Sequence, residues 1–332
     1  MTIEYQMIEH ALQRREELLA QWRHEKTNFF RAFHGATEGI SGLSIDCYGA
    51  LILIQTWRSE LITERDVERI VALLSEWLGQ EMIGVWNERH RRGQVDFANS
   101  PVLSNAYTGL ECGLSYDVRL RHEGIDPLLF LDFRAARRWV SQNSHNKRVL
   151  NLFAYTCGIG VAALAGGAKS VLNVDFAERS LAVGMQNAQL NQLNMKRFSC
   201  LQEDVFPVIR QLSGLGVKGR AARRPFKRLK PQQFDLVILD PPRLAKSPFG
   251  KVDLVNDYAA LFKPVALTVA EGGCALVTNN VASVDESDWH EQLERCAQKA
   301  GRPFANLKPL RPEEDFPSPD GRWPLKMAIL EW

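Results

Sequence analysis

Three features that would point to particular classes of protein are missing from this 332-residue sequence. Its six cysteines form no CxxC pair and no cluster with histidine at metal-ligand spacing, so we expect neither a metal site nor a disulfide framework. No apolar run is long enough to cross a membrane. Residues 1–21 are charged and amphipathic, and they do not resemble an export signal. We therefore expect a cytoplasmic protein with reduced cysteines.

The sequence also lacks a strong excess of charge of either sign. It has 41 Lys and Arg residues against 39 Asp and Glu residues, a net charge of +2. Binding to nucleic acid by bulk charge is thereby excluded, and any such contact must come from a local patch. Residues 218–230 are one candidate, because they contain seven basic residues and no acidic one. A phosphate-contacting loop and a solvated insertion both fit this composition.

Length and hydrophobic patterning predict two domains. Apolar residues make up 45% of the chain, enough for a large core without disulfides or metals. We expect an N-terminal helix within residues 1–28 and a small α+β domain over residues 29–145, which ends in a strand pair that serves as a linker. Its predicted elements are strands at 43–46 and 51–57 around a turn at 48–49, a helix at 64–78, a strand at 82–86 and the strand pair at 110–120.

Residues 146–332 show a different pattern, in which apolar runs alternate with helical segments. Near-continuous apolar strands separated by helices indicate a parallel sheet covered on both faces, that is, a doubly wound, Rossmann-like α/β domain. The predicted strands lie at 148–153, 170–175, 199–202, 234–240, 274–279, 304–310 and 326–332. The predicted helices lie at 159–165, 177–193, 204–212, 252–269 and 286–300.

Ligands of such sheets bind at the carboxyl ends of the strands. Gly158 and Gly160 follow the first strand and allow close approach of the backbone to a ligand. Asp175 ends the second strand, where an acidic side chain can accept hydrogen bonds from ribose hydroxyls, and Asp204 follows the third. The glycines also fit a loose dinucleotide pattern with Ala163, and they fit ordinary loop glycines with Asp175 as a helix cap.

The fourth strand favours a methyltransferase over a dehydrogenase. It ends in Asp240-Pro241-Pro242, and two consecutive prolines make a rigid, extended loop with no amide donors. Such a loop can hold a planar group at a set height above a methyl donor. A simple turn at the end of a strand is the competing interpretation.

These motifs resemble the class I S-adenosylmethionine-dependent methyltransferases. More narrowly, they are similar to the bacterial large-subunit ribosomal RNA methyltransferases that act on cytosine C5 or guanine N7. The motifs are residues 149–160, Asn173-Val174-Asp175, Glu203-Asp204-Val205-Phe206 and Asp240-Pro241-Pro242, with residues 42–46 and 130–134 upstream. The resemblance implies a seven-stranded sheet, S-adenosylmethionine as the cofactor, ribosomal RNA as the partner and a central domain that helps to grip RNA.

The sequence departs from this family in four places. The family's N-terminal RNA-binding PUA module is not recognisable, and the predicted helix in residues 1–28 stands in its place. Residues 130–134 correspond to the family's tyrosine-leucine-aspartate-glutamine-arginine stretch, but Phe133 stands where glutamine is usual. Cys157 replaces a usual glycine, and the basic segment 218–230 is longer than expected.

The choice of methylated atom depends on a cysteine. Methylation of a pyrimidine C5 needs a thiolate that adds to C6, and in the cytosine and uracil relatives this cysteine follows strand five. Here that strand ends in Thr278-Asn279-Asn280, while Cys274 is expected in the core and Cys157 in the cofactor loop. We therefore favour nitrogen methylation, as at guanine N7, which needs only alignment of a free lone pair with the methyl group.

The site residues follow from these motifs. Amide side chains can hydrogen-bond a base edge, and arginine can stack on a base or hold a phosphate. The predicted catalytic residues are Asp240, Pro241, Pro242 and Asn279, and the predicted substrate-binding residues are Arg243, Asn280, Arg223 and Arg224. The predicted cofactor-binding residues are Phe153, Ala154, Tyr155, Gly158, Asp175, Phe176, Asp204, Val205 and Asp240. Two other hypotheses stay open: a methyltransferase for a small molecule or protein, and an RNA-binding protein that keeps the fold without turnover.

Overall fold

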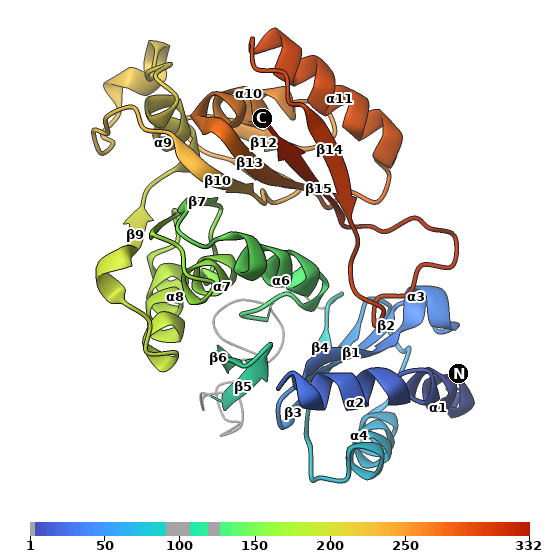
Figure 1. Cartoon of the computed structure of the whole chain (residues 1–332). Coiled ribbons are helices and arrows are strands. Elements are labelled where there is room, and N and C mark those ends of the chain that lie inside the picture. Colours follow the sequence, from blue (N-terminus) through green and yellow to red (C-terminus); the bar gives the residue numbers. More distant parts are fainter. Residues whose placement is uncertain (1–3, 91–106, 119–126) are drawn as a thin grey trace. The chain divides into compact units, whose positions relative to one another are not determined.

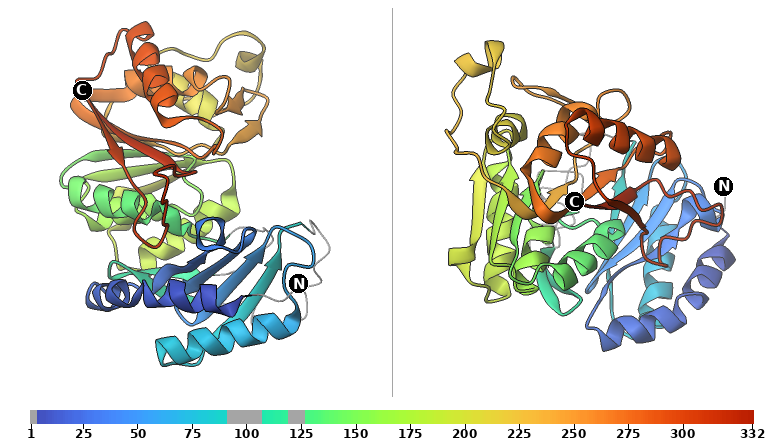
Figure 2. Two further views of the ribbon diagram at one scale, coloured as in Figure 1. Left: turned by 90° about the vertical axis from the view of Figure 1, so that its right-hand side faces the viewer. Right: turned by 45° about the horizontal axis from the view of Figure 1, so that its top comes forward.

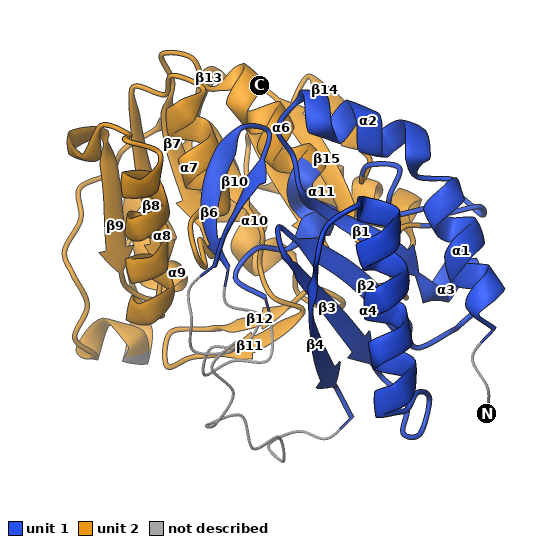
Figure 3. Cartoon of the chain, turned by 90° about the horizontal axis from the view of Figure 1, so that it is seen from below, with its two compact units in different colours: residues 1–134, 313–322 blue, residues 135–312, 323–332 orange. Residues whose placement is uncertain are grey.

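The computed structural model describes residues 4–90, 107–118 and 127–332. The chain divides into two compact units, shown in different colours in Figure 3. The first comprises residues 1–134 together with 313–322, and the second comprises residues 135–312 together with 323–332. The boundary predicted from the sequence, after residue 145, would have placed the helix α6 (Arg134–Asn143) in the first domain and residues 313–322 in the second.

A four-stranded sheet of order β1-β2-β3-β4 forms the centre of the first unit. β2 (Leu43–Tyr48) and β3 (Leu51–Thr56) make the predicted hairpin, and Gly49 takes the left-handed conformation that its turn requires. β4 (Ile83–Glu88) runs parallel to β3. β1 (Phe29–His34) pairs antiparallel with β2 and was not predicted, because its sequence FFRAFH has no clean alternation of apolar and polar residues.

Three helices contribute apolar side chains to one core with this sheet. α4 (Glu64–Leu78) has the predicted bounds and begins at a Thr63–Asp66 capping box. The predicted N-terminal helix is two helices, α1 (Tyr5–Gln13) and α2 (Glu16–His24), and a turn at Arg14 and Arg15 separates them. The short helix α3 (Gly35–Glu38) follows β1, and the predicted strand pair is β5 (Tyr107–Glu111) with β6 (Leu114–Val118). Residues 119 and 120 of that prediction lie outside the described residues.

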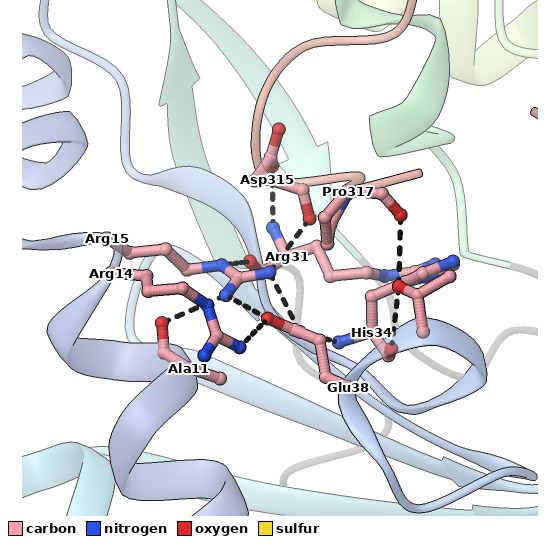
Figure 4. A network of polar contacts seen from close by, with 9 residues as sticks. Ala11, Arg14, Arg15, Arg31, His34, Glu38, Asp315 and Pro317 are labelled. Atoms are coloured by element: carbon pink, nitrogen blue, oxygen red, sulfur yellow. Dashed lines mark hydrogen bonds and ion pairs between the residues drawn. The ribbon is translucent and has the colours of Figure 1, made fainter. Parts of the chain in front are cut away.

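A buried polar network explains both the broken helix and the return of residues 313–322 to the first unit (Figure 4). The guanidinium of Arg15 donates to the Arg31 carbonyl, to the Glu38 carboxylate and to the Asp315 carbonyl. The Asp315 carboxylate accepts from the Arg31 amide at 2.9 Å and from Arg134 at 2.7 Å. Since Arg134 and Asp315 have no exposed side-chain surface, removal of one partner would leave a buried uncompensated charge.

The second unit confirms the predicted fold class. Its seven-stranded sheet has the order β14-β15-β13-β10-β7-β8-β9, parallel except for the antiparallel β15. Figures 1 and 2 show helices on both faces: α6, α7 and α8 on one, and α9, α10 and α11 on the other. The strands are β7 (Arg148–Leu152), β8 (Ser170–Asp175), β9 (Phe198–Gln202), β10 (Phe234–Leu239), β13 (Val269–Asn279), β14 (Asn306–Leu310) and β15 (Lys326–Glu331).

The remaining elements connect these strands. The helices are α7 (Gly158–Ala165), α8 (Glu178–Leu190), α9 (Val205–Leu212), α10 (Ala259–Thr268) and α11 (Glu286–Lys299). A small hairpin of β11 (Leu244–Lys246) and β12 (Lys251–Asp253) follows β10, and the short 3-10 helices are η1 (Leu131–Phe133), η2 (Met195–Arg197) and η3 (Gly219–Arg223). The switch point of the sheet lies between β7 and β10, whose carboxyl ends pair at Leu152 and Leu239. Among the described residues, no helix is both long enough and apolar enough to span a membrane.

Candidate active site

The loop between β7 and α7 has an unusual backbone. Phe153, Tyr155 and Cys157 all have left-handed φ values, of 57°, 47° and 57°, although none is a glycine. Such conformations cost of order 1–3 kcal/mol each and persist only where the surrounding structure imposes them. The loop lies at the switch point, so the strain is located at the position where doubly wound folds bind ligands.

Asp175, the last residue of β8, holds this loop in place. Its carboxylate accepts one hydrogen bond from the Tyr155 amide and one from the Ala177 amide, both at 2.9 Å. The side chain is 7% exposed, and its burial raises the pKa of the Asp175 carboxyl. A carboxylate has about four lone-pair positions, so Asp175 keeps capacity for further donors such as a ribose diol.

Two buried asparagine side chains link the strands β7, β8 and β9 by hydrogen bonds. Asn151 of β7 donates to the Asn173 side-chain oxygen at 3.0 Å, and Asn173 of β8 donates to the Ser199 carbonyl of β9. A Cβ on Gly160 would lie 2.1 Å from that Asn173 oxygen, so only glycine allows α7 to approach the sheet this closely. Gly160, predicted to let the backbone approach a ligand, is therefore also needed for helix–sheet packing.

The third segment predicted to bind the cofactor follows β9. Asp204 accepts a hydrogen bond from the Phe206 amide at 2.8 Å and thereby caps α9, while Val205 is buried in the core. Phe176, next to Asp175, has 72% of its surface exposed. An exposed aromatic ring at a ligand-binding edge is a natural stacking surface for a planar heterocycle.

Asp240 follows β10 and receives a hydrogen bond of 2.6 Å from the Thr278 hydroxyl of β13. Pro241 is buried, whereas Pro242 and Arg243 are exposed. The β11–β12 hairpin comes next, so the Pro-Pro step connects the sheet edge to a short antiparallel ribbon. Residues 240–242 have no regular secondary structure, so a loop does follow the fourth strand directly.

The two asparagines predicted at the end of β13 lie in different environments. Asn279 is fully buried, where it donates to the Leu254 carbonyl and accepts from the Val281 amide. Asn280 is exposed and donates to the Pro241 carbonyl at 3.5 Å. Asn279 therefore shapes the loop from inside, and Asn280 presents an amide at the surface.

Lys326, the first residue of β15, was missed by sequence reasoning. Its side chain is only 3% exposed, and it donates to the Val281 and Pro324 carbonyls at 2.8 and 3.1 Å. Burial lowers the pKa of the Lys326 ammonium group. Together with Asn279 it fixes the loop that follows β13. A lone lysine at the start of a C-terminal strand carries no signal of this role, because its partners are backbone carbonyls.

The distal half of the basic segment is attached to the second unit at defined points. The Lys227 amide donates to the Glu203 carboxylate at 2.9 Å, and the Gln211 side chain bonds the backbone of Lys227 and of Leu229. The Phe226 ring packs edge-on against Phe249 of the β11–β12 turn, with 5.9 Å between centroids. The segment is thus connected both to the cofactor motif at Glu203 and to the ribbon after Pro242.

Several basic side chains of this segment lie at the surface. Arg223 and Arg224 are exposed at the end of η3, and Lys227 is exposed beside Phe226. The Arg228 guanidinium lies 4.5 Å above the Phe226 ring centroid. Exposed cations with an adjacent aromatic ring can contact a phosphate backbone and a base face.

Sheet register brings most predicted site residues to one edge. Leu152 pairs with Val174 on one side and with Leu239 on the other. Each of these three residues directly precedes a predicted site residue. Phe153, Asp175 and Asp240 therefore end neighbouring strands. An aspartate beside a strained loop, an exposed ring and a Pro-Pro step fit a nucleoside-containing ligand without a diphosphate.

Comparison with known proteins decides the family. Residues 85–329, about three quarters of the chain, match the family of S-adenosylmethionine-dependent methyltransferases. The chain belongs to this family. The enzyme therefore uses S-adenosylmethionine as its cofactor, in agreement with the prediction from the motifs, and the dinucleotide interpretation of Gly158 and Gly160 is rejected.

Relatives of the methyltransferase are found among bacterial proteins. Ribosomal RNA large subunit methyltransferase I of Aeromonas salmonicida is 28% identical over 296 residues, which cover 87% of this chain and 70% of the relative. The Escherichia coli (strain SMS-3-5 / SECEC) protein of the same name is 26% identical and covers 92% and 75%. Among solved structures, a protein from Streptococcus mutans assigned as a SAM-dependent methyltransferase has a TM-score of 0.77 at 24% identity, covering 100% and 82%. This last likeness supports the fold.

Proposed function

We propose that this methyltransferase modifies a base nitrogen of large-subunit ribosomal RNA, in the manner of guanine-N7 methylation. The observation that carries the proposal is the position of Asp240-Pro241-Pro242 at the switch point, beside the strained β7–α7 loop. The β11–β12 hairpin that follows Pro242 contacts the basic segment through Phe249 and Phe226. The names of the two bacterial relatives, both large-subunit ribosomal RNA methyltransferases, support RNA as the substrate.

The cofactor site is assigned to the β7, β8 and β9 edges. Asp175 accepts from the ribose hydroxyls, and the Phe176 ring stacks on the adenine. Bound S-adenosylmethionine supplies an electrophilic methyl group on a sulfonium. The other residues assigned to cofactor contacts are Phe153, Ala154, Tyr155, Gly158, Asp204, Val205 and Asp240.

The acceptor site is assigned to the β10 and β13 ends. Asp240, oriented by Thr278, accepts from a base amino group, and the exposed amide of Asn280 bonds the base edge. Pro241 and Pro242 set the height of the base without offering amide donors that would compete for its acceptors. Asn279 acts by holding the loop from inside. A guanine N7 has a free lone pair, so the enzyme needs no general base for its attack.

RNA binding is assigned to the basic segment and the ribbon that it contacts. Arg223 and Arg224 contact phosphates, which adds affinity but no sequence choice. Arg243 lies between the Pro-Pro step and the ribbon, where a guanidinium can hold the phosphate next to the target nucleotide or stack on a base. Residues 29–145 are proposed to provide further RNA contacts.

Transfer of a tritiated methyl group from S-adenosylmethionine to ribosomal RNA tests the proposal. The RNA comes from a strain without the gene, as naked RNA and as assembled subunits, and the labelled nucleoside is identified by mass spectrometry. Labelled 7-methylguanosine is the expected product. Labelled 5-methylcytidine would overturn the choice of atom. Transfer only to protein or small molecules, or cofactor binding without any transfer, would overturn RNA methylation.

A further inference from the structure

Two cysteines from distant parts of the sequence meet beside the cofactor loop. In the sheet, Asn151 of β7 is in register with Asn173 of β8, which is in register with Cys200 of β9. The side chains of these three residues therefore point to the same face. Their strand neighbours Leu150, Val174 and Leu201 belong to the core on the opposite face, so Cys200 faces the layer of α7 and α8.

The amino-terminal end of α7 covers this row. Gly160 lies over Asn173, and Cys157 is the N-cap residue of α7, three positions before Gly160. Cys157 also contacts α8, where a Cβ on Gly184 would lie 2.5 Å from the Cys157 sulfur. The thiols of Cys157 and Cys200 lie close enough for each to shift the pKa of the other, and the Cys157 thiol donates to the Tyr155 carbonyl at 3.9 Å. All six cysteines are free, and this pair links two segments of the cofactor site.

We propose that Cys157 and Cys200 form a reversible disulfide when the enzyme meets hydrogen peroxide, and that this bond weakens S-adenosylmethionine binding. The site is a modification site for a two-electron oxidant. It uses residues of this chain alone, and it does not depend on which acceptor the enzyme methylates.

The environments of the two sulfurs set the order of events. Cys200 is partly exposed, and its interaction with the Cys157 thiol lowers the pKa of the Cys200 thiol. Cys157 is fully buried, and burial raises the pKa of its thiol, so it stays protonated. An accessible, low-pKa thiol beside a second thiol is the arrangement of peroxide-sensing cysteines.

The reaction then runs in two balanced steps. The Cys200 thiolate attacks one peroxide oxygen, an S–O bond forms, and the departing hydroxide takes a proton to leave as water. Cys157 attacks the resulting sulfenic acid, the S–S bond forms, and the hydroxyl leaves as a second water with the proton of Cys157. The two thiols are oxidised by two electrons in total, and the peroxide is reduced by two. A small dithiol reverses the reaction by exchange.

The bond affects the cofactor because Cys157 ends the strained loop. Formation of the disulfide requires the two sulfurs to move from non-bonded separation to covalent distance. The loop, with left-handed residues at Phe153, Tyr155 and Cys157, has to follow. The hydrogen bond from the Tyr155 amide to the Asp175 carboxylate then breaks, and the loop no longer has the shape that binds the cofactor. We expect the Kd for S-adenosylmethionine to rise by about tenfold or more, which is about 1.4 kcal/mol or more.

The test uses the full chain, purified with dithiothreitol and then exposed to hydrogen peroxide. Peptide mapping by mass spectrometry is expected to find a cross-linked pair of peptides that contain Cys157 and Cys200. Calorimetry is expected to show weakened S-adenosylmethionine binding that dithiothreitol restores. Both effects should vanish in Cys200→Ser and in Cys157→Gly, the latter a change that suits the left-handed backbone at this position.

Cys112→Ser is the matched control, because Cys112 is partly exposed like Cys200 but lies in the first unit. It should respond to peroxide as the wild type does. The proposal is overturned if both thiols remain available to an alkylating reagent after peroxide treatment. It is also overturned if the cross-link forms and cofactor affinity is unchanged. Neither outcome bears on RNA methylation, which is assayed under reducing conditions.

Discussion

The Thr278 hydroxyl of β13 donates a hydrogen bond of 2.6 Å to the Asp240 carboxylate at the end of β10. The two strands are parallel neighbours, paired from Leu236 to Leu239, so the bond connects the two loops assigned to the methyl acceptor. The Tyr258 hydroxyl, in turn, donates to the Thr278 carbonyl at 2.9 Å. The hydrogen bond from Thr278, which is itself held by Tyr258, thus orients the Asp240 carboxylate.

Thr278→Val should therefore lower kcat with little change in cofactor affinity. Valine keeps the shape of threonine but removes a hydrogen bond to a charged group, which is worth about 1.5–3 kcal/mol, or about 10–100-fold in rate if fully expressed. Steady-state kinetics with RNA and calorimetry with S-adenosylmethionine measure the two effects. Thr278→Ser keeps the hydroxyl and should retain most of the activity. Equal loss in both variants would show that packing, and not the hydrogen bond, matters at this position.

Asp175→Ala and Asp240→Ala should separate cofactor binding from transfer. Loss of Asp175 removes the anchor of the Tyr155 amide and the ribose acceptor, so calorimetry should show S-adenosylmethionine binding weakened by about tenfold to a hundredfold. Loss of Asp240 should abolish methyl transfer to RNA and leave most of the cofactor affinity. If each variant lost binding and transfer to the same extent, the assigned roles would be contradicted.

Gly160→Ala should destabilise the fold. The new Cβ would lie 2.1 Å from the Asn173 side-chain oxygen, so α7 or the buried asparagines must shift. Overpacking of this kind costs about 1–3 kcal/mol in the free energy of unfolding, measurable by urea denaturation. The double variant Gly160→Ala with Asn173→Ala provides the control, because removal of the amide makes room. Its loss of stability should be smaller than the sum of the two single losses, and strict additivity would argue against the contact.

Arg223→Ala and Arg224→Ala together should weaken RNA binding in a salt-dependent manner. The slope of log affinity against log salt concentration is negative, and each lost phosphate contact makes it less negative by about 0.7–0.9. Filter binding at several salt concentrations measures that slope. Lys299→Ala, at an exposed position near the end of α11, is the control for the loss of a surface charge. An unchanged slope in the double variant would remove the basic segment from the RNA-binding surface.

His34 should make the stability of the protein pH-dependent. Burial, followed by the charge of Arg31, lowers the pKa of His34 from 6.5 to about 4. Its Nδ1 lies 3.0 Å from the Arg31 guanidinium, so the ring is neutral and accepts that hydrogen bond (Figure 4). Between about pH 6.5 and 4 the unfolded chain binds a proton on His34 that the folded chain does not, so the free energy of unfolding falls as the pH falls.

The expected loss across that range is about 3 kcal/mol, complete once the pH reaches about 4. His34→Gln keeps a hydrogen-bond acceptor for Arg31 and does not titrate. Urea denaturation at pH 7.5 and pH 4.5 should therefore show a smaller loss for the variant. Burial raises the pKa of Glu38, but the hydrogen bond and the charge of Arg15 outweigh this and leave that pKa lowered, so acidification removes the stabilisation by Glu38 in both proteins. Parallel losses would show that His34 is not the titrating group.

Local patterns were sufficient for much of the fold. The alternation of apolar strands with helices predicted the seven strands of the second unit and its doubly wound sheet, because a buried parallel strand needs a continuous apolar run. The Tyr48-Gly49 turn and the capped helix at 64–78 were also recognisable, since each depends on residues close in sequence. β1 was missed because its burial depends on partners rather than on its own periodicity.

The sequence by itself determined the family and the cofactor, because the motifs of the cofactor edge are short and each lies at the end of a predictable strand. Only the tertiary structure decided how the site is held. In the folded chain, Asn279 is buried whereas Asn280 is exposed, and Lys326 donates to the Val281 carbonyl. Cys157 and Cys200 also come close to each other. Residues 313–322 return to the first unit through Asp315. These contacts join residues far apart in the chain, and their energies come from burial and geometry, which no local pattern of residue types encodes.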